Sequence, residues 1–136
     1  MITYAHELQH IVQEARFPKL MIVNSVLRAN LWRFKQALTE LDLPAEVEAN
    51  IVSKRVAEAV SGAEAVQKFA EEQVKRMKDE NAAEQLVRWQ FFLSTPSSMR
   101  YDFADRTLEL VREYKGRMDF GMDVNATDWW HGAGKS

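Results

Sequence analysis

Apolar residues recur three and four positions apart along most of the chain, which is the period of an amphipathic α-helix. Near the N-terminus this spacing links Ala5, Leu8, Ile11 or Val12, and Ala15. Pro18 disfavours helical geometry at Phe17 and begins a second helix more readily than it continues the first. The pattern therefore predicts a short amphipathic helix that ends near residue 17.

The next segment carries a heptad pattern with one polar member, Asn24. Apolar steps of four and three residues alternate through Leu20, Asn24, Leu27, Leu31, Phe34, Leu38 and Leu41. In a coiled coil such an Asn fixes register or oligomeric state, whereas in a single-chain bundle it is a buried amide bonded to a neighbour. We expect one continuous helix here and favour the buried amide for Asn24, with the coiled coil as the alternative.

Three further helices follow from start and stop signals. Pro44 precedes an Ala- and Glu-rich stretch that runs to about Glu80, and the pair Ser61-Gly62 predicts a bend or break within it. Asn81 is placed to cap a helix that stops before Pro96, and the last helix is expected over residues 97–118. The mixed charges of residues 71–80 indicate a solvated surface.

These patterns predict an all-α protein built as an antiparallel helical bundle or as long helical hairpins. Two-residue alternation is not sustained anywhere, so no strand is expected. Residues 1–118 form the expected helical domain, and residues 119–136 an extended aromatic tail.

Composition and charge remove several classes of function. The 18 basic and 20 acidic residues leave no basic excess to neutralise a phosphate backbone, so nucleic acid is not an expected partner. The chain has no cysteine, and its first ten residues lack the features of a secretory signal. Its most apolar run, "LMIVNSVL", is too short for a transmembrane segment. We therefore expect a cytoplasmic protein.

"HELQH" at residues 6–10 has the spelling of a zinc-peptidase helix, with His6 and His10 as ligands and Glu7 as general base. The extended form of the motif fails, because Gln13 and Arg16 occupy its later Gly and His places. We therefore expect no cofactor and no enzymatic activity, and keep His6 and His10 as the candidate metal ligands.

In two stretches the apolar side chains are more numerous than one buried face of a helix needs. Two adjacent Trp residues also lie in the tail. A helix that is apolar nearly all round is covered on several sides, either in the middle of a bundle or by a partner. The candidate residues for binding a partner or a hydrophobic surface are Leu20, Val23, Leu27, Trp32, Trp89, Phe91, Phe92, Trp129 and Trp130.

Two segments, "KDENAAEQLVRWQ" (78–90) and "YDFADRTLELVREY" (101–114), follow an Ala- and Glu-rich helical stretch. Through them, residues 63–118 resemble the phasin family of polyester-granule proteins. The resemblance implies a cytoplasmic, non-enzymatic protein that coats polyhydroxyalkanoate inclusions through apolar helix faces.

The leading hypothesis is accordingly a non-catalytic helical binding or assembly protein, with phasin-like coating of polyester granules as its most specific form. Its expected partners are a second copy of the chain, another protein or the granule surface. The alternatives are a small subunit or adaptor that docks through Trp129 and Trp130, and a zinc-dependent hydrolase that uses the HELQH motif.

Overall fold

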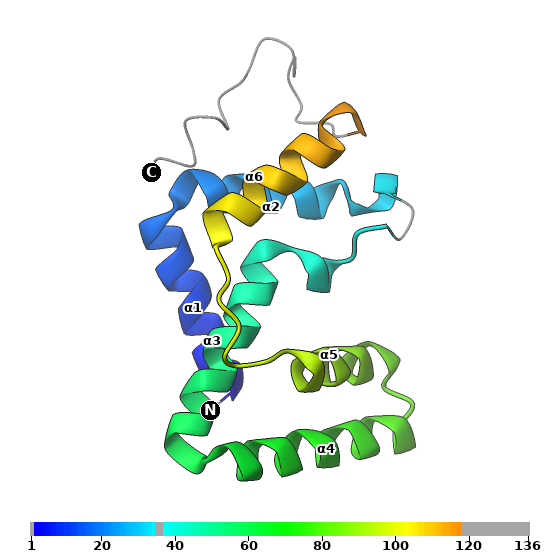
Figure 1. The fold of residues 1–136 in the computed structure, drawn as a ribbon. Helices are drawn as coiled ribbons and strands as arrows, with labels where there is room; N and C mark the ends of the chain where they lie inside the picture. The colour runs from blue at the N-terminus through cyan, green and yellow to red at the C-terminus, as the bar shows by residue number, and fades with distance from the viewer. Residues whose placement is uncertain (1, 35–36, 118–136) are drawn as a thin grey trace. The chain divides into compact units, whose positions relative to one another are not determined.

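A computed structural model describes residues 2–34 and 37–117 (Figure 1). Regular structure within these residues is entirely helical, which confirms the all-α prediction. The α-helices are α1 (Ile2–Arg16), α2 (Pro18–Ala29), α3 (Pro44–Ser61), α4 (Ala63–Asp79), α5 (Ala83–Ser94) and α6 (Phe103–Tyr114). Short 3₁₀-helices are η1 (Leu31–Phe34), η2 (Glu40–Asp42) and η3 (Lys115–Arg117). Among the described helices, none has the length and apolar character needed to cross a membrane.

The chain divides into two compact units. Unit 1 comprises Met1–Gln9 and Ala49–Arg100, and unit 2 comprises His10–Glu48 and Tyr101–Ser136. Helices α1 and α3 therefore each contribute residues to both units. The predicted boundary between a helical domain (1–118) and an aromatic tail (119–136) stays a prediction, because residues 118–136 lie outside the described residues.

The breaks predicted at proline and glycine are confirmed. α1 ends at Arg16 and α2 begins at Pro18, while α3 begins at Pro44. Gly62 separates α3 from α4 with a φ of 88°, a left-handed conformation that only glycine adopts without steric cost. The long helix expected from residue 44 to 80 is therefore two helices.

The single helix expected from Leu20 to Leu41 is wrong, because α2 ends at Ala29. The buried Asn30 donates its side-chain amide to the carbonyl of Val26 at 2.8 Å, and the chain continues into η1. Four of the apolar positions, Leu20, Leu27, Phe34 and Leu38, are nevertheless buried, while Leu31 and Leu41 are half-buried. The main cluster of unit 2 contains Val23, Leu27, Phe34, Leu38, Leu43, Leu110, Val111 and Tyr114.

Two other helix starts differ from expectation. α6 begins at Phe103 instead of near residue 97, because the Asp102 carboxylate accepts a hydrogen bond from the Asp105 amide at 2.9 Å and caps the helix there. Asn81 does not cap α5, which begins at Ala83. Asn81 instead takes a positive φ of 53° in the turn before the helix, a conformation that Asn tolerates better than most residues.

Asn24 is the buried amide that the sequence favoured. Its Nδ2 donates to the Leu20 carbonyl at 2.9 Å and to Thr107 Oγ1 at 3.1 Å, and its Oδ1 accepts from the Ala45 amide at 3.1 Å. Ala45 lies in the first turn of α3, where backbone N–H groups have no partner within the helix. One side chain therefore connects α2, α3 and α6 within unit 2.

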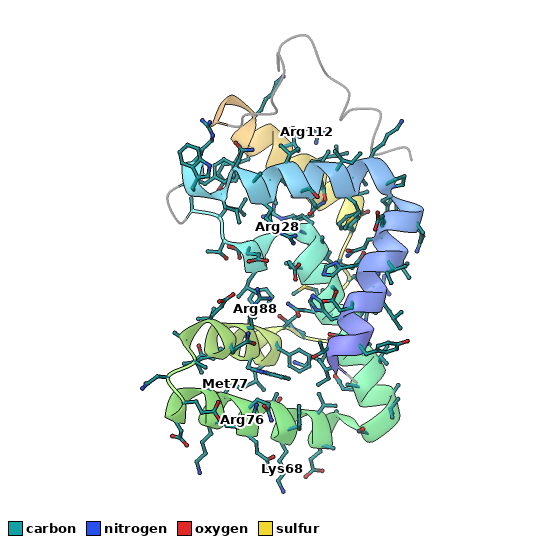
Figure 2. All side chains as sticks on the ribbon, turned by 180° about the vertical axis from the view of Figure 1, so that it is seen from behind. Arg28, Lys68, Arg76, Met77, Arg88 and Arg112 are labelled. Atoms are coloured by element: carbon teal, nitrogen blue, oxygen red, sulfur yellow. The ribbon has the colours of Figure 1, made fainter. Side chains whose placement is uncertain are left out.

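α4 and α5 form an antiparallel hairpin in unit 1, joined by the short link 80–82, which confirms the predicted helical hairpin (Figure 1). Met77 lies on the side of α4 that faces α5, whereas Lys68 points away from it (Figure 2). The core cluster of this unit is formed by Ala57, Val66, Ala70 and Phe92, with Ile2, Trp89 and Leu93 packed against it.

A buried lysine, Lys54, binds the end of this hairpin. Its Nζ donates to the carbonyls of Thr95 at 2.7 Å, Phe92 at 3.0 Å and Leu93 at 3.3 Å. A cation is favourable at a helix C-terminus, where the last carbonyls have no partner within the helix. Burial lowers the pKa of Lys54 below its usual value, while the nearby Glu58 carboxylate acts in the opposite direction.

The three hydrogen bonds of Asn24 predict the cost of replacing it. Asn24→Leu would leave the Ala45 amide and the Thr107 hydroxyl with one hydrogen bond fewer inside the core, so we expect a loss of about 1–3 kcal/mol in the free energy of unfolding. Ser25→Ala, at the exposed neighbouring position, should change that free energy by less than about 0.5 kcal/mol. Urea denaturation followed by circular dichroism measures both, and equal stability of the two variants would contradict this role.

Candidate functional site

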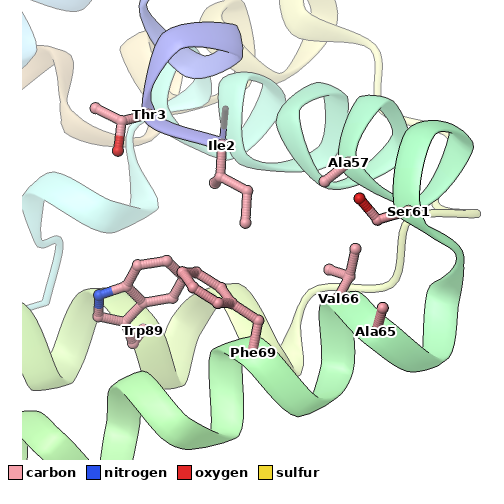
Figure 3. Close-up of a pocket in the computed structure, with 8 residues that line it drawn as sticks. All are labelled: Ile2, Thr3, Ala57, Ser61, Ala65, Val66, Phe69 and Trp89. Carbon is pink, nitrogen blue, oxygen red and sulfur yellow. The ribbon is translucent and has the colours of Figure 1, made fainter.

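An apolar pocket lies within unit 1 and has a volume of about 420 Å³. Its apolar lining comes from Ile2, Ala57, Ala65, Val66, Phe69 and Trp89, and Thr3 and Ser61 add hydroxyl groups (Figure 3). Pockets that bind small molecules typically measure about 300–1,000 Å³ and are lined mainly by apolar and aromatic side chains. The size and lining of this pocket therefore suit an apolar group.

Two aromatic rings form one side of the pocket. Phe69 on α4 and Trp89 on α5 meet edge to face, with ring centroids 5.8 Å apart, and Trp89 meets Phe92 in the same way at 5.5 Å. The side chain of Ile2 points toward the two rings that line the pocket (Figure 3). Phe92 is buried in the core of unit 1, so these ring contacts hold the aromatic side of the pocket against the packed interior.

The outward face of α1 carries an apolar row, defined here as Tyr4, Leu8, Ile11 and Val12, all of which are exposed. Leu8, Ile11 and Ala15, three positions of the predicted amphipathic pattern, are therefore exposed. The side of α1 that is buried carries Ala5 and Gln13 instead, and Gln13 is only 1% exposed. Its amide bonds to backbone and side-chain oxygens, which stabilises a polar group in the interior.

A polar centre surrounds His10 in unit 2. His10 Nδ1 lies 2.9 Å from Gln13 Oε1, and His10 Nε2 lies 3.3 Å from the buried carboxylate oxygen Oε1 of Glu46. Arg28 Nη2 donates to the same Glu46 oxygen at 2.9 Å and its Nε lies 3.8 Å from Glu40 (Arg28 is labelled in Figure 2). The Glu46 carboxylate, in the first turn of α3, thus lies between the His10 imidazole and the Arg28 guanidinium.

The structure separates the predicted binding residues into buried and exposed groups. Leu20, Val23 and Leu27 are fully buried in unit 2. Phe92 is buried in unit 1, with Trp89 and Phe91 half-buried beside it. Trp32 is 72% exposed, with the Arg33 guanidinium 4.5 Å from the centre of its ring. Trp129 and Trp130 lie outside the described residues.

Of the candidates within the described residues, Trp89 alone lines the pocket. Phe69 was not among the predicted binding residues. It is an exposed aromatic side chain on α4, a helix of mixed charge, and an aromatic residue among charged ones is the feature that could have identified it. Sequence reasoning also missed Glu46, because nothing in its local sequence distinguishes a carboxylate that contacts His10 from an ordinary acidic residue in the first turn of a helix.

The HELQH motif forms part of a continuous helix, so His6 and His10 lie one turn apart on the same face of α1. Glu7, the position of the general base in the motif, is exposed. Comparison of the chain with models of protein families, with curated proteins and with solved structures finds no match.

Proposed function

We propose that this chain is a non-catalytic helical binding protein that takes up an apolar group in the pocket of unit 1. The observation that carries the proposal is the pocket itself, whose lining is mostly apolar and whose aromatic side is fixed by the core. Binding to such a lining is favourable because it removes apolar ligand surface from water, which contributes about 25 cal/mol per Å² buried. The two hydroxyl groups of the lining can form hydrogen bonds with a polar group at one end of the ligand.

Coating of a polyester surface is the more specific form of this proposal. It is supported by the apolar row of α1, which presents Tyr4, Leu8, Ile11 and Val12 outward on consecutive turns. An amphipathic helix with an outward apolar face binds to an interface in proportion to the apolar area it buries. A hydrophobic polyester is the surface expected from the phasin resemblance.

Filling the pocket should weaken binding of an apolar probe. We expect Ala65→Leu to reduce binding of a fluorescent apolar dye such as anilinonaphthalene sulfonate, because the added side chain occupies part of the lined volume. Ala63→Leu is the matched control, since Ala63 is also exposed on α4 but does not line the pocket. Dye titration monitored by fluorescence measures both, and indistinguishable titrations of the two variants would contradict the pocket as the binding site.

The apolar row should determine adsorption to polyester. Ile11→Lys is expected to lower the affinity for poly(3-hydroxybutyrate) particles about tenfold or more, since burying one such side chain is worth about 1.5–3 kcal/mol. Ile22→Lys is the matched control, because Ile22 is 56% exposed on α2 and Ile11 is 62% exposed on α1. A sedimentation assay measures the adsorbed fraction. Equal adsorption of wild type and Ile11→Lys, or no adsorption at all, would refute the coating role and leave the pocket proposal standing.

A further inference from the structure

The pocket of unit 1 carries an indole N–H that is available to a ligand. Trp89 on α5 lines the pocket and is half-buried. Its ring contacts Phe69 and Phe92, and its Nε1 forms no hydrogen bond with any residue in the described part of the chain. An indole N–H can only donate. A ligand that covers it therefore has to offer an acceptor, or the N–H loses its hydrogen bond to water.

The ring contacts of Trp89 limit where this donor can point. The indole meets the Phe69 ring at an interplanar angle of 74° and the Phe92 ring at 71°. Turning the indole would break edge-to-face contacts with both neighbours, so its orientation is held by the aromatic cluster. The indole nitrogen lies at the end of the ring that is remote from Phe69 (Figure 3).

Thr3 provides a second donor on the same side of the pocket. Its hydroxyl oxygen points toward the Trp89 indole (Figure 3) and, within the described residues, has no hydrogen-bond partner. A carbonyl oxygen has two lone pairs and can accept from both groups at once. The two donors therefore suit one carbonyl group better than they suit a second donor.

The lining also selects against charge. None of the described residues that line the pocket has an ionisable side chain. An ionic group placed inside would lose its hydration without gaining a partner of opposite charge. An ion could therefore bind only with its charge left in solvent, and a polar group inside the pocket has to be uncharged.

We propose that the pocket of unit 1 selects apolar molecules that carry an uncharged carbonyl group, such as esters and ketones. The carbonyl oxygen accepts from Trp89 Nε1 and from the Thr3 hydroxyl, while the hydrocarbon part lies against the apolar lining. This inference rests on the proposed function, because it names the class of ligand that the same pocket takes.

The test compares two probes of nearly identical shape on the full chain. In 2-methyl-1-nonene a CH₂ group replaces the carbonyl oxygen of 2-nonanone, so only the ketone can accept a hydrogen bond. Displacement of the neutral fluorescent dye Nile red gives the Kd of each probe. Trp89→Phe keeps an aromatic ring in the pocket but removes the N–H. We expect it to raise the Kd of the ketone about three- to tenfold, the value of one neutral hydrogen bond, and to leave that of the alkene nearly unchanged.

Thr3→Val is the second variant, since it removes the other donor at an exposed position and tests the inference even if Trp89→Phe does not fold. It should also weaken binding of the ketone more than binding of the alkene. Trp32→Phe is the matched control, because Trp32 is 72% exposed in unit 2 and does not line the pocket. Circular dichroism would show whether each variant is folded.

The outcomes separate this inference from the proposed function. If Trp89→Phe and Thr3→Val change the Kd of both probes equally, or if Trp32→Phe has the same selective effect, the preference for a carbonyl is overturned and the pocket remains a binding site. If neither probe displaces the dye, or if Ala65→Leu leaves displacement unchanged, the pocket proposal fails and this inference fails with it.

Discussion

Hydrogen bonds from buried side chains to the ends of helices are the interaction on which each unit depends. The first N–H groups and last carbonyls of every helix lack partners within it, and burying them unpaired is costly. Asn24 accepts from the first turn of α3 in unit 2, and Lys54 donates to the last carbonyls of α5 in unit 1. Each of these side chains bonds to several groups at once. It therefore holds the helix end in place in addition to pairing the polar groups there.

Gln13 is a second buried amide in unit 2, and it lies on the inward side of α1. Its buried amide holds the Ala45 carbonyl and orients His10, so this side of α1 faces inward although it is polar. The consequence is that the apolar row of Tyr4, Leu8, Ile11 and Val12 points outward. One buried glutamine therefore bonds to α3 and fixes the orientation of the His10 imidazole, on the side of α1 opposite to the exposed apolar row.

The sequence predicted the helical class and the breaks at Pro18, Pro44 and Gly62, because each follows from local backbone chemistry, and the heptad spacing placed Asn24 among the core positions. It failed where a distant partner decides the outcome. The apolar period of α1 indicated the wrong face, since the partner of Gln13 lies on α3. The pocket, whose lining is drawn from α1, α3, α4 and α5, could not be assembled from spacing, and Glu46 needed the fold to bring it beside His10.

The role of buried hydrogen bonds at helix ends is tested most directly by hydrogen exchange of the Ala45 amide, followed residue by residue with NMR. Amides in the first turn of a helix ordinarily exchange rapidly, and Ala63 in the first turn of α4 serves as the internal reference. Because Ala45 donates to the buried Asn24, its amide should exchange only when unit 2 unfolds, far more slowly than that of Ala63. Exchange of both amides at similar rates would contradict the account.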